Sequence, residues 1–174
     1  GPAMLRSGEF LRFWKRYPQT ARKGQTIRLG EIGLTQFAIR HGFSHAATCD
    51  LANLPAEIAH LSDARLDQVF QRLITMQDRR FIDLHAALQN SSTDRETKER
   101  FIIAAAKRIG PSYALAEFLV HDRGLPFLKK SPAALHPASS AATLVIAADI
   151  AGPIAPLVIE EATRLSRRLA QTAG

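Results

Sequence analysis

The chain has 174 residues, of which 46% are hydrophobic and 22% are charged, and its formal net charge is +7 at pH 7. This length and composition suit one folded domain and argue against wholesale disorder. The single cysteine, Cys49, excludes an intrachain disulfide and is typical of a reducing compartment. No uninterrupted apolar run reaches the ~20 residues that a membrane-spanning helix needs, and no secretory signal is visible, so we expect a cytoplasmic protein.

The positive charge is concentrated at the beginning of the chain. Residues 1–40 contain eight basic side chains and two acidic ones, so they carry +6 of the net +7. Such an asymmetry is typical of a protein that meets an acidic protein surface, nucleic acid or anionic lipid. Residues 1–3, Gly-Pro-Ala ahead of Met4, are typical of the remnant of a cleaved affinity tag. We therefore divide the chain into the remnant 1–3, a basic aromatic segment 4–33 and a helical domain 34–174.

In the N-terminal segment, residues 5–17 have aromatic side chains at helical spacing, with cations between them. Pro18 ends this predicted helix, because proline lacks an amide hydrogen and its ring clashes with the preceding turn. Residues 19–33 contain three glycines and little periodicity, which predicts a loop with a short extended piece at 26–29. A helix over 34–42 follows, ended by a glycine. We then expect a helix over 44–54 and a short one after it.

The stretch from Ser62 to Gln89 is predicted to be the centre of the fold. Ser62 can cap a helix through its hydroxyl. Apolar residues then recur at steps of three and four, which keeps one face of an α-helix apolar over several turns. This face consists of Leu66, Val69, Phe70, Leu73, Ile74, Phe81, Leu84 and Leu88. Position 77 interrupts the stripe. Burying one such side chain contributes roughly 1.5–3 kcal/mol, so we expect the other helices to pack around this face.

After the polar residues 90–92, the sequence at 93–96, Thr-Asp-Arg-Glu, is predicted to be a capping box that opens a helix ending at Gly110. Pro111 suits the first position of the next helix, which ends near Gly124. Residues 125–140 are rich in proline and serine and predict a long surface loop. Two more helices, over 141–151 and 156–171, complete an all-α fold. We expect a single globular domain of about seven or eight short helices, packed orthogonally.

Residues 34–54 are one candidate for nucleic-acid binding, as a helix-turn-helix-like segment. Ala38 and Gly42 lie four residues apart, which suits close packing at the turn, and residues 44–54 would be the recognition helix. That helix has no Lys or Arg, and Asp50 would face phosphate. Few of its side chains are of the kinds that read base edges. A plain structural turn is the simpler interpretation.

Metal binding and catalysis have weaker support. His41, His45 and Cys49 follow one another at steps of four, which would suit zinc on one helical face. A helix end is predicted between the first two, and no fourth ligand has the spacing of a metal motif. No glycine-rich phosphate loop, metalloprotease spacing or nucleophile elbow is present. We therefore predict no metal and no cofactor, and an enzyme of unrecognised type is only the third hypothesis for function.

The basic aromatic segment is the predicted binding site. Cations beside aromatic rings can contact phosphates and stack on bases, pack on the protein while their charges stay in water, or lie on anionic lipid. The predicted partner- or nucleic-acid-binding residues are Arg12, Trp14, Lys15, Arg16, Arg22, Lys23, Arg28 and Arg40. We expect a non-catalytic helical protein–protein interaction module, an adaptor, chaperone-like or scaffold subunit of a bacterial assembly. The alternatives are a nucleic-acid-binding regulator using this segment and residues 34–54, a membrane-surface partner, and a homo-oligomer.

Overall fold

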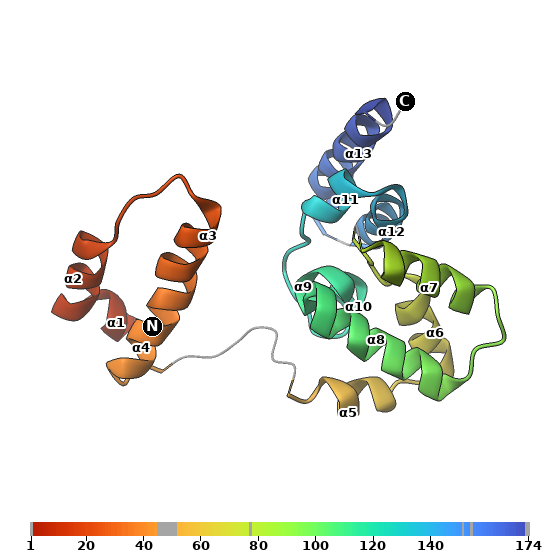
Figure 1. The fold of residues 1–174 in the computed structure, drawn as a ribbon, viewed down its shortest axis with the longest axis horizontal. Coiled ribbons are helices and arrows are strands. Elements are labelled where there is room, and N and C mark those ends of the chain that lie inside the picture. Colours follow the sequence, from red (N-terminus) through yellow and green to blue (C-terminus); the bar gives the residue numbers. More distant parts are fainter. Residues whose placement is uncertain (1, 45–51, 77, 151, 154, 173–174) are drawn as a thin grey trace. The chain divides into compact units, whose positions relative to one another are not determined.

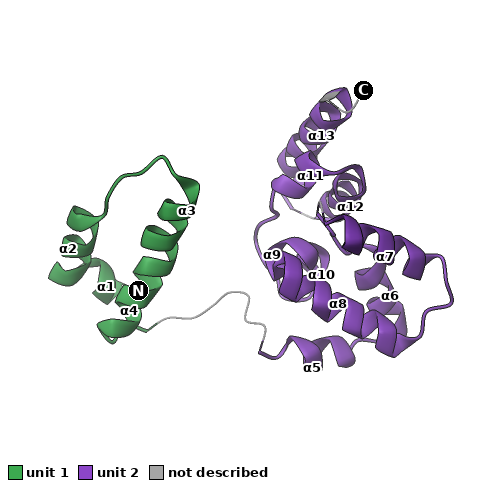
Figure 2. Cartoon of the chain, viewed as in Figure 1, with its two compact units in different colours: residues 1–48 green, residues 49–174 purple. Residues whose placement is uncertain are grey.

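The computed structural model describes residues 2–44, 52–76, 78–150, 152–153 and 155–172, and every regular element in them is a helix (Figure 1). The all-α prediction is confirmed. The chain divides into two compact units, which we call unit 1, Gly1–Thr48, and unit 2, Cys49–Gly174 (Figure 2). The prediction of a single globular domain is therefore not confirmed. The boundary between the units also differs from the one predicted after residue 33, because a continuous helical run crosses that position.

Unit 1 is a helical hairpin whose arms are α2 and the run α3–η1–α4. Its helices are α1, Pro2–Leu5; α2, Gly8–Arg16; α3, Lys23–Thr26; the π-helix η1, Ile27–Ile32; and α4, Gly33–Arg40. The loop and extended piece predicted at 19–33 are therefore wrong from residue 23 onward. Gly30 serves close packing and not a turn, since a Cβ there would lie 3.1 Å from the hydroxyl of Tyr17.

Unit 2 contains the hydrophobic core. Its helices are α5, Leu54–Ala59; α6, Asp63–Gln71; α7, Arg79–Gln89; α8, Arg95–Ile109; α9, Pro111–Ala114; α10, Ala116–His121; α11, Ser131–Leu135; α12, Pro137–Ala148; and α13, Ala155–Thr172. The first five residues of the predicted apolar stripe, Leu66 to Ile74, are all buried. Phe70 and Ile74 are completely inaccessible, as are Ile58 and Ile102 on α5 and α8. This half of the predicted central helix is the centre of the core.

The second half of the stripe lies on a separate helix, so the prediction of one helix from 62 to 89 is wrong. The amide of Ile74 donates to the carbonyl of Ala114 at 3.1 Å and thus leaves the helical hydrogen-bond ladder. Met76 has a φ of 56°, which a continuing right-handed helix excludes. Asp78 then caps α7, because its carboxylate accepts a hydrogen bond from the Phe81 amide at 3.4 Å.

Helix α8 begins one residue later than the predicted capping box. Its N-cap is Asp94, whose carboxylate accepts hydrogen bonds from the amide of Thr97 at 2.8 Å and from the hydroxyl of Thr97 at 2.9 Å. The hydroxyl of Thr93 instead donates to the carbonyl of Leu88 at 2.7 Å. The bond from the Thr97 amide holds the pKa of Asp94 below its ordinary value, so the carboxylate stays charged at the positive end of the helix dipole.

The predicted surface loop at 125–140 is wrong in its second half. Helix α11 and the first residues of α12 lie in it, and each begins with a proline in its first turn, Pro132 and Pro137. The amide that proline lacks would be unsatisfied there in any case, so these prolines start helices and do not break them. Ala133 is also completely buried, which a surface loop would not allow.

A buried carboxylate joins α6 to α10. The side chain of Glu117 is 2% exposed, and its oxygens accept hydrogen bonds from the guanidinium of Arg65 at 2.5 and 2.9 Å. Arg65 also pairs with Asp122, while Arg72 lies 3.8 Å from Glu117 and pairs with Asp149 at the end of α12. Burial lowers the pKa of Arg65, but the two carboxylates outweigh it and raise the pKa overall. The guanidinium therefore stays charged.

The last three helices, α11, α12 and α13, pack against one another at one end of unit 2 (Figure 1). A groove of about 250 Å³ lies between them, with Leu157 of α13, which is 66% exposed, at its edge. In the part of the chain that the structure describes, no helix combines the length and the apolar character needed to cross a bilayer.

Candidate functional site

Helix α2 places four aromatic rings along one side. Ser7 opens the helix, since its backbone is extended and its hydroxyl accepts a hydrogen bond from the Phe10 amide at 3.1 Å. The aromatic residues follow at steps of three and four, which is the spacing of one helical face. They are Phe10, Phe13, Trp14 and Tyr17. The helix ends at Arg16, ahead of Pro18, so the predicted N-terminal helix is confirmed over 8–16.

These rings hold the two arms of the hairpin together. The ring centroid of Phe13 lies 5.2 Å from that of Trp14 and 5.3 Å from that of Phe37 on α4. The ring of Trp14 is also 5.3 Å from that of Tyr17, and Phe37 is 4.5 Å from the ring of His41. Trp14 meets Phe13 edge to face, at an angle of 86° between the ring planes. Such pairs each add roughly 0.5–1.5 kcal/mol beyond their burial.

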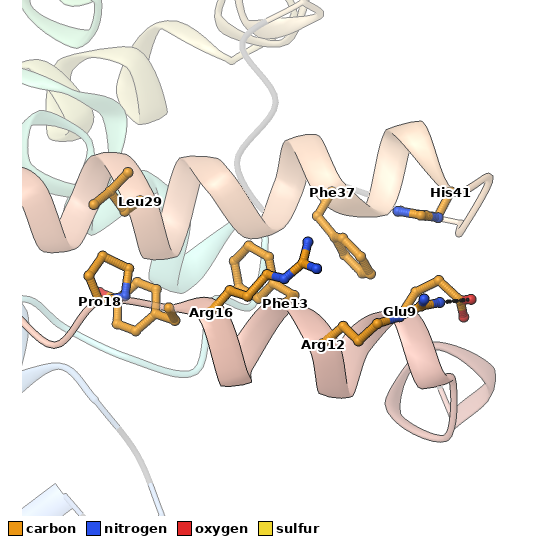
Figure 3. Close-up of a pocket in the computed structure, with 9 residues that line it drawn as sticks. Glu9, Arg12, Phe13, Arg16, Pro18, Leu29, Phe37 and His41 are labelled. Carbon is orange, nitrogen blue, oxygen red and sulfur yellow. Dashed lines mark hydrogen bonds and ion pairs between the residues drawn. The ribbon is translucent and has the colours of Figure 1, made fainter.

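An open groove of about 510 Å³ lies between α2 and the η1–α4 run. Its lining residues are Glu9, Arg12, Phe13, Arg16, Tyr17, Pro18, Leu29, Phe37 and His41. Figure 3 shows that the two helices run antiparallel, with Glu9 and His41 at one end of the groove and Pro18 and Leu29 at the other. The site therefore has a mainly apolar lining and one polar end.

Two cations on α2, Arg12 and Arg16, line the groove one helical turn apart (Figure 3). Arg12 donates a hydrogen bond to the carboxylate of Glu9 at 2.8 Å. The pKa of Glu9 is lowered from its ordinary value, first by a hydrogen bond from its own backbone amide and then by Arg12. The groove thus combines two exposed guanidinium groups with one ionised carboxylate.

All eight predicted binding residues are exposed, and the structure brings only some of them together. Arg12 and Arg16 line the groove, and Trp14, which is 43% exposed, packs on ring edges beside it. The predicted cations outside the lining are Lys15, Arg22, Lys23, Arg28 and Arg40. They add to the positive charge of unit 1, since residues 1–48 contain eight basic side chains against two acidic ones.

Unit 1 buries very little of its apolar surface. Among its described residues only Ala38 is buried. Leu5, Leu11 and Ile32 are each more than half exposed. A pair of helices has one shared face and cannot enclose a core of its own, so the other apolar faces of this hairpin stay in water.

Sequence reasoning missed the wall of the groove that η1 and α4 supply. Its lining residues Leu29, Phe37 and His41 are separated by multiples of four positions, which places them on one helical face. Because a loop is predicted at 19–33, this spacing is not interpreted there as a helical face. Glu9 was also not predicted as a site residue, because its role depends on the facing helix.

Residues 45–51 lie outside the described residues, and with them most of the candidate recognition helix and two of the three candidate zinc ligands, His45 and Cys49. The first helix of that segment corresponds to α4, and Gly42 after it has a φ of 69°, as a helix-ending glycine does. Among the described residues, no group of three or more His, Cys, Asp and Glu side chains is arranged to hold a metal ion.

No protein-family model matches the chain, and no curated protein and no solved structure is significantly similar to it. The groove of unit 1 and the charge around it are therefore the basis for a functional conclusion.

Proposed function

We propose that this chain is a non-catalytic protein–protein interaction module, an adaptor or scaffold subunit whose unit 1 docks onto a partner protein. The observation that carries the proposal is the uneven burial of the two units. Unit 1 buries one described residue and exposes six large apolar side chains, whereas unit 2 buries a full core. An apolar and positively charged surface of this kind is typical of an interaction site.

Docking would remove the open faces of the hairpin from water. Complete burial of a Leu or Ile side chain contributes roughly 1.5–3 kcal/mol relative to full exposure. Leu29, at the groove, is 39% exposed, and Ile32 and Ile39 beyond it are 54% and 46% exposed. A partner that covers these side chains therefore gains several kcal/mol of apolar burial before any charge is paired.

In this proposal unit 2 is the scaffold. Its helices surround α6 in an orthogonal arrangement, and the protein works in the cytoplasm as one subunit of a bacterial assembly. The proposal is supported by the dense packing around Phe70 and by the ion pairs of Glu117, which stabilise unit 2 as a folded body of its own.

Site-specific photo-crosslinking in cells that naturally express the chain tests the proposal. A photoreactive amino acid is placed at Leu29 in the groove, and in a matched variant at the exposed position Arg80 of unit 2. We expect one protein to be crosslinked from Leu29 and not from Arg80, and to bind the purified chain in isothermal titration calorimetry. If no protein is crosslinked from Leu29, or the same set is crosslinked from both positions, the proposal is wrong.

Nucleic-acid binding is the second candidate, and the exposure of all seven predicted cations with Trp14 beside them favours it. A nucleic-acid ligand would bind with an affinity that falls steeply as salt rises, because phosphate contacts release counterions. Replacing Lys15, Arg16, Arg22 and Lys23 together by Ala would then abolish binding of a mixed-sequence duplex or single strand. An absence of binding at low salt would remove this candidate.

A further inference from the structure

The groove of unit 1 has the length of a short helix. It extends along α2 from Glu9 to Arg16, which is about 10 Å at a rise of ~1.5 Å per residue, and continues past the helix end to Pro18. Phe13 contributes to its lining from α2, and Leu29 and Phe37 contribute from the facing run. Two antiparallel helices with an apolar groove between them leave room for a third helix, whose apolar ridge packs into the groove.

The charges on the α2 wall repeat with the period of a helix. Arg12 and Arg16 are four residues apart, so their positions are separated by about 6 Å along the axis. Acidic side chains four residues apart on a partner helix have the same repeat and can pair with both. The surrounding positive charge of unit 1, eight basic side chains against two acidic ones, attracts such a segment from a distance.

The polar end and the ring packing favour a peptide over nucleic acid. Glu9 lines the groove and pairs with Arg12 at 2.8 Å, so a continuous phosphate backbone would meet a carboxylate at this end and a cation that already has a partner. A protein helix can present a neutral or basic side chain at that position. Nucleic-acid bases would stack on the faces of the aromatic rings. Trp14 packs edge to face with both Phe10 and Phe13, so part of this ring surface is already covered.

We propose that the groove between α2 and the η1–α4 run binds an amphipathic helix of a partner protein, with acidic residues flanking an apolar ridge. The bound helix completes a three-helix unit and covers Leu29 and Phe37. This inference rests on the proposed interaction function and specifies the chemistry of the partner segment. The acidic residues pair with Arg12 and Arg16, and the end near Glu9 and His41 takes a neutral or basic residue.

Synthetic peptides test the proposal on the full chain. One peptide of about 14 residues, since shorter helices are marginal in water, has Leu on one face, Glu beside it and no tryptophan. The second peptide has Lys in place of Glu, and a mixed-sequence single-stranded oligonucleotide is the third probe. Trp14 is the single tryptophan of the chain, is 43% exposed and contacts Phe13 of the groove, so its fluorescence reports binding.

Two double variants change the net charge of the chain by the same amount, one in the groove and one on unit 2. Arg12→Glu/Arg16→Glu alters the groove, and Arg80→Glu/Lys107→Glu alters exposed cations on unit 2 by the same net charge. We expect the Glu peptide to bind at least tenfold more tightly than the Lys peptide. The groove variant should bind it at least tenfold more weakly, and the unit 2 variant within about twofold of the original chain, because Arg80 and Lys107 do not line the groove and exposed charges are screened by salt. Arg16→Gln is a milder second variant, and circular dichroism checks that each variant is helical.

The proposal is overturned if both peptides bind alike, if neither binds, if both charge variants weaken binding equally, or if the oligonucleotide binds more tightly than the Glu peptide. Its failure is distinct from failure of the interaction function. A partner that is crosslinked from Leu29 while the Glu peptide does not bind refutes the acidic-helix inference and leaves the interaction module in place. No crosslinked partner refutes the interaction module, whatever the peptide does.

Discussion

Replacing Glu117 by Gln removes one charge from the buried ion pairs of unit 2 and keeps the size of the side chain. Loss of one partner from a buried pair costs about 3–5 kcal/mol, because the remaining charge is left without compensation. Arg65 is 20% exposed and still pairs with Asp122, and Arg72 still pairs with Asp149. Water and these carboxylates therefore offset part of the lost stabilisation. We therefore expect Glu117→Gln to lower the free energy of unfolding by about 2–3 kcal/mol.

Urea unfolding followed by far-ultraviolet circular dichroism measures this change. With a slope of about 1–3 kcal/mol per molar urea, the midpoint should fall by roughly 1 M or more. Glu96→Gln is the matched control, because Glu96 pairs with Arg100 at 3.7 Å on the surface, and it should change the stability by less than about 0.5 kcal/mol. The double variant Arg65→Met/Glu117→Leu should recover at least half of the loss, since apolar replacements of a buried pair are often neutral. A loss for Glu117→Gln as small as that of the control would refute this account of the buried carboxylate.

Three further predictions concern the core, its pH dependence and one helix cap. Phe70 is completely buried, so Phe70→Ala should lower the free energy of unfolding by about 3–5 kcal/mol; a loss under about 1 kcal/mol in urea titration would contradict its place in the core. Burial lowers the pKa of His85 below the ordinary 6.5, although its Nε2 donates to the carbonyl of Phe70 at 2.7 Å. The unfolded chain therefore takes up a proton near pH 6.5 and the folded chain does not, so this contribution to stability is complete above pH 6.5 and is lost as the pH falls below it. Urea midpoints between pH 7.5 and 5 should show the decline, and His85→Gln should flatten it; an equal decline in that variant would assign the effect to another group. Asp94→Ala should lower the urea midpoint more than Thr93→Ala, because Asp94 accepts the hydrogen bonds at the start of α8; the reverse order would restore Thr93 as the N-cap.

The parts of the fold that follow from local spacing were predictable. The stripe from Leu66 to Ile74 is buried as its period predicts, and Ser62 caps α6 through its hydroxyl, which accepts from the Arg65 amide at 3.3 Å. Helices α8, α12 and α13 were also predicted near their observed places. In each case residues within a few positions of one another determine the element, so the sequence alone contains the signal.

The missed parts depend on contacts between distant residues. The break between α6 and α7 is stabilised by the bond from Ile74 to Ala114 and by the pair between Asp78 and Arg108 at 3.1 Å. The polar residue at position 77 interrupts the apolar stripe in the sequence at this break. On α7, Phe81 and Leu88 still pack against the core, whereas Leu84 is 45% exposed, so the stripe continues only in part. The three glycines in residues 19–33 favour a loop by composition, and the close packing of Gly30 against Tyr17 depends on the facing arm of the hairpin.

The candidate site was predicted only on its α2 side. Arg12 and Arg16 were among the predicted residues because charge density shows directly in the sequence. Phe37 and Leu29 could not be placed beside them without the antiparallel arrangement of the hairpin. Charge is a property of single residues, whereas a groove requires two segments to face each other.

The uneven burial of the two units also sets how long their backbone amides stay protected from solvent. Amides of α8, around the completely buried Ile102, exchange hydrogen for deuterium only when most of unit 2 opens. Amides of α2 are held by a few ring contacts, so they exchange at a much smaller opening free energy. A bound partner adds to that opening free energy in proportion to the logarithm of its concentration relative to its Kd. If unit 1 docks onto a partner as proposed, the abundance of that partner would set how long the N-terminal hairpin resists exchange and proteolysis, and it would leave unit 2 unaffected.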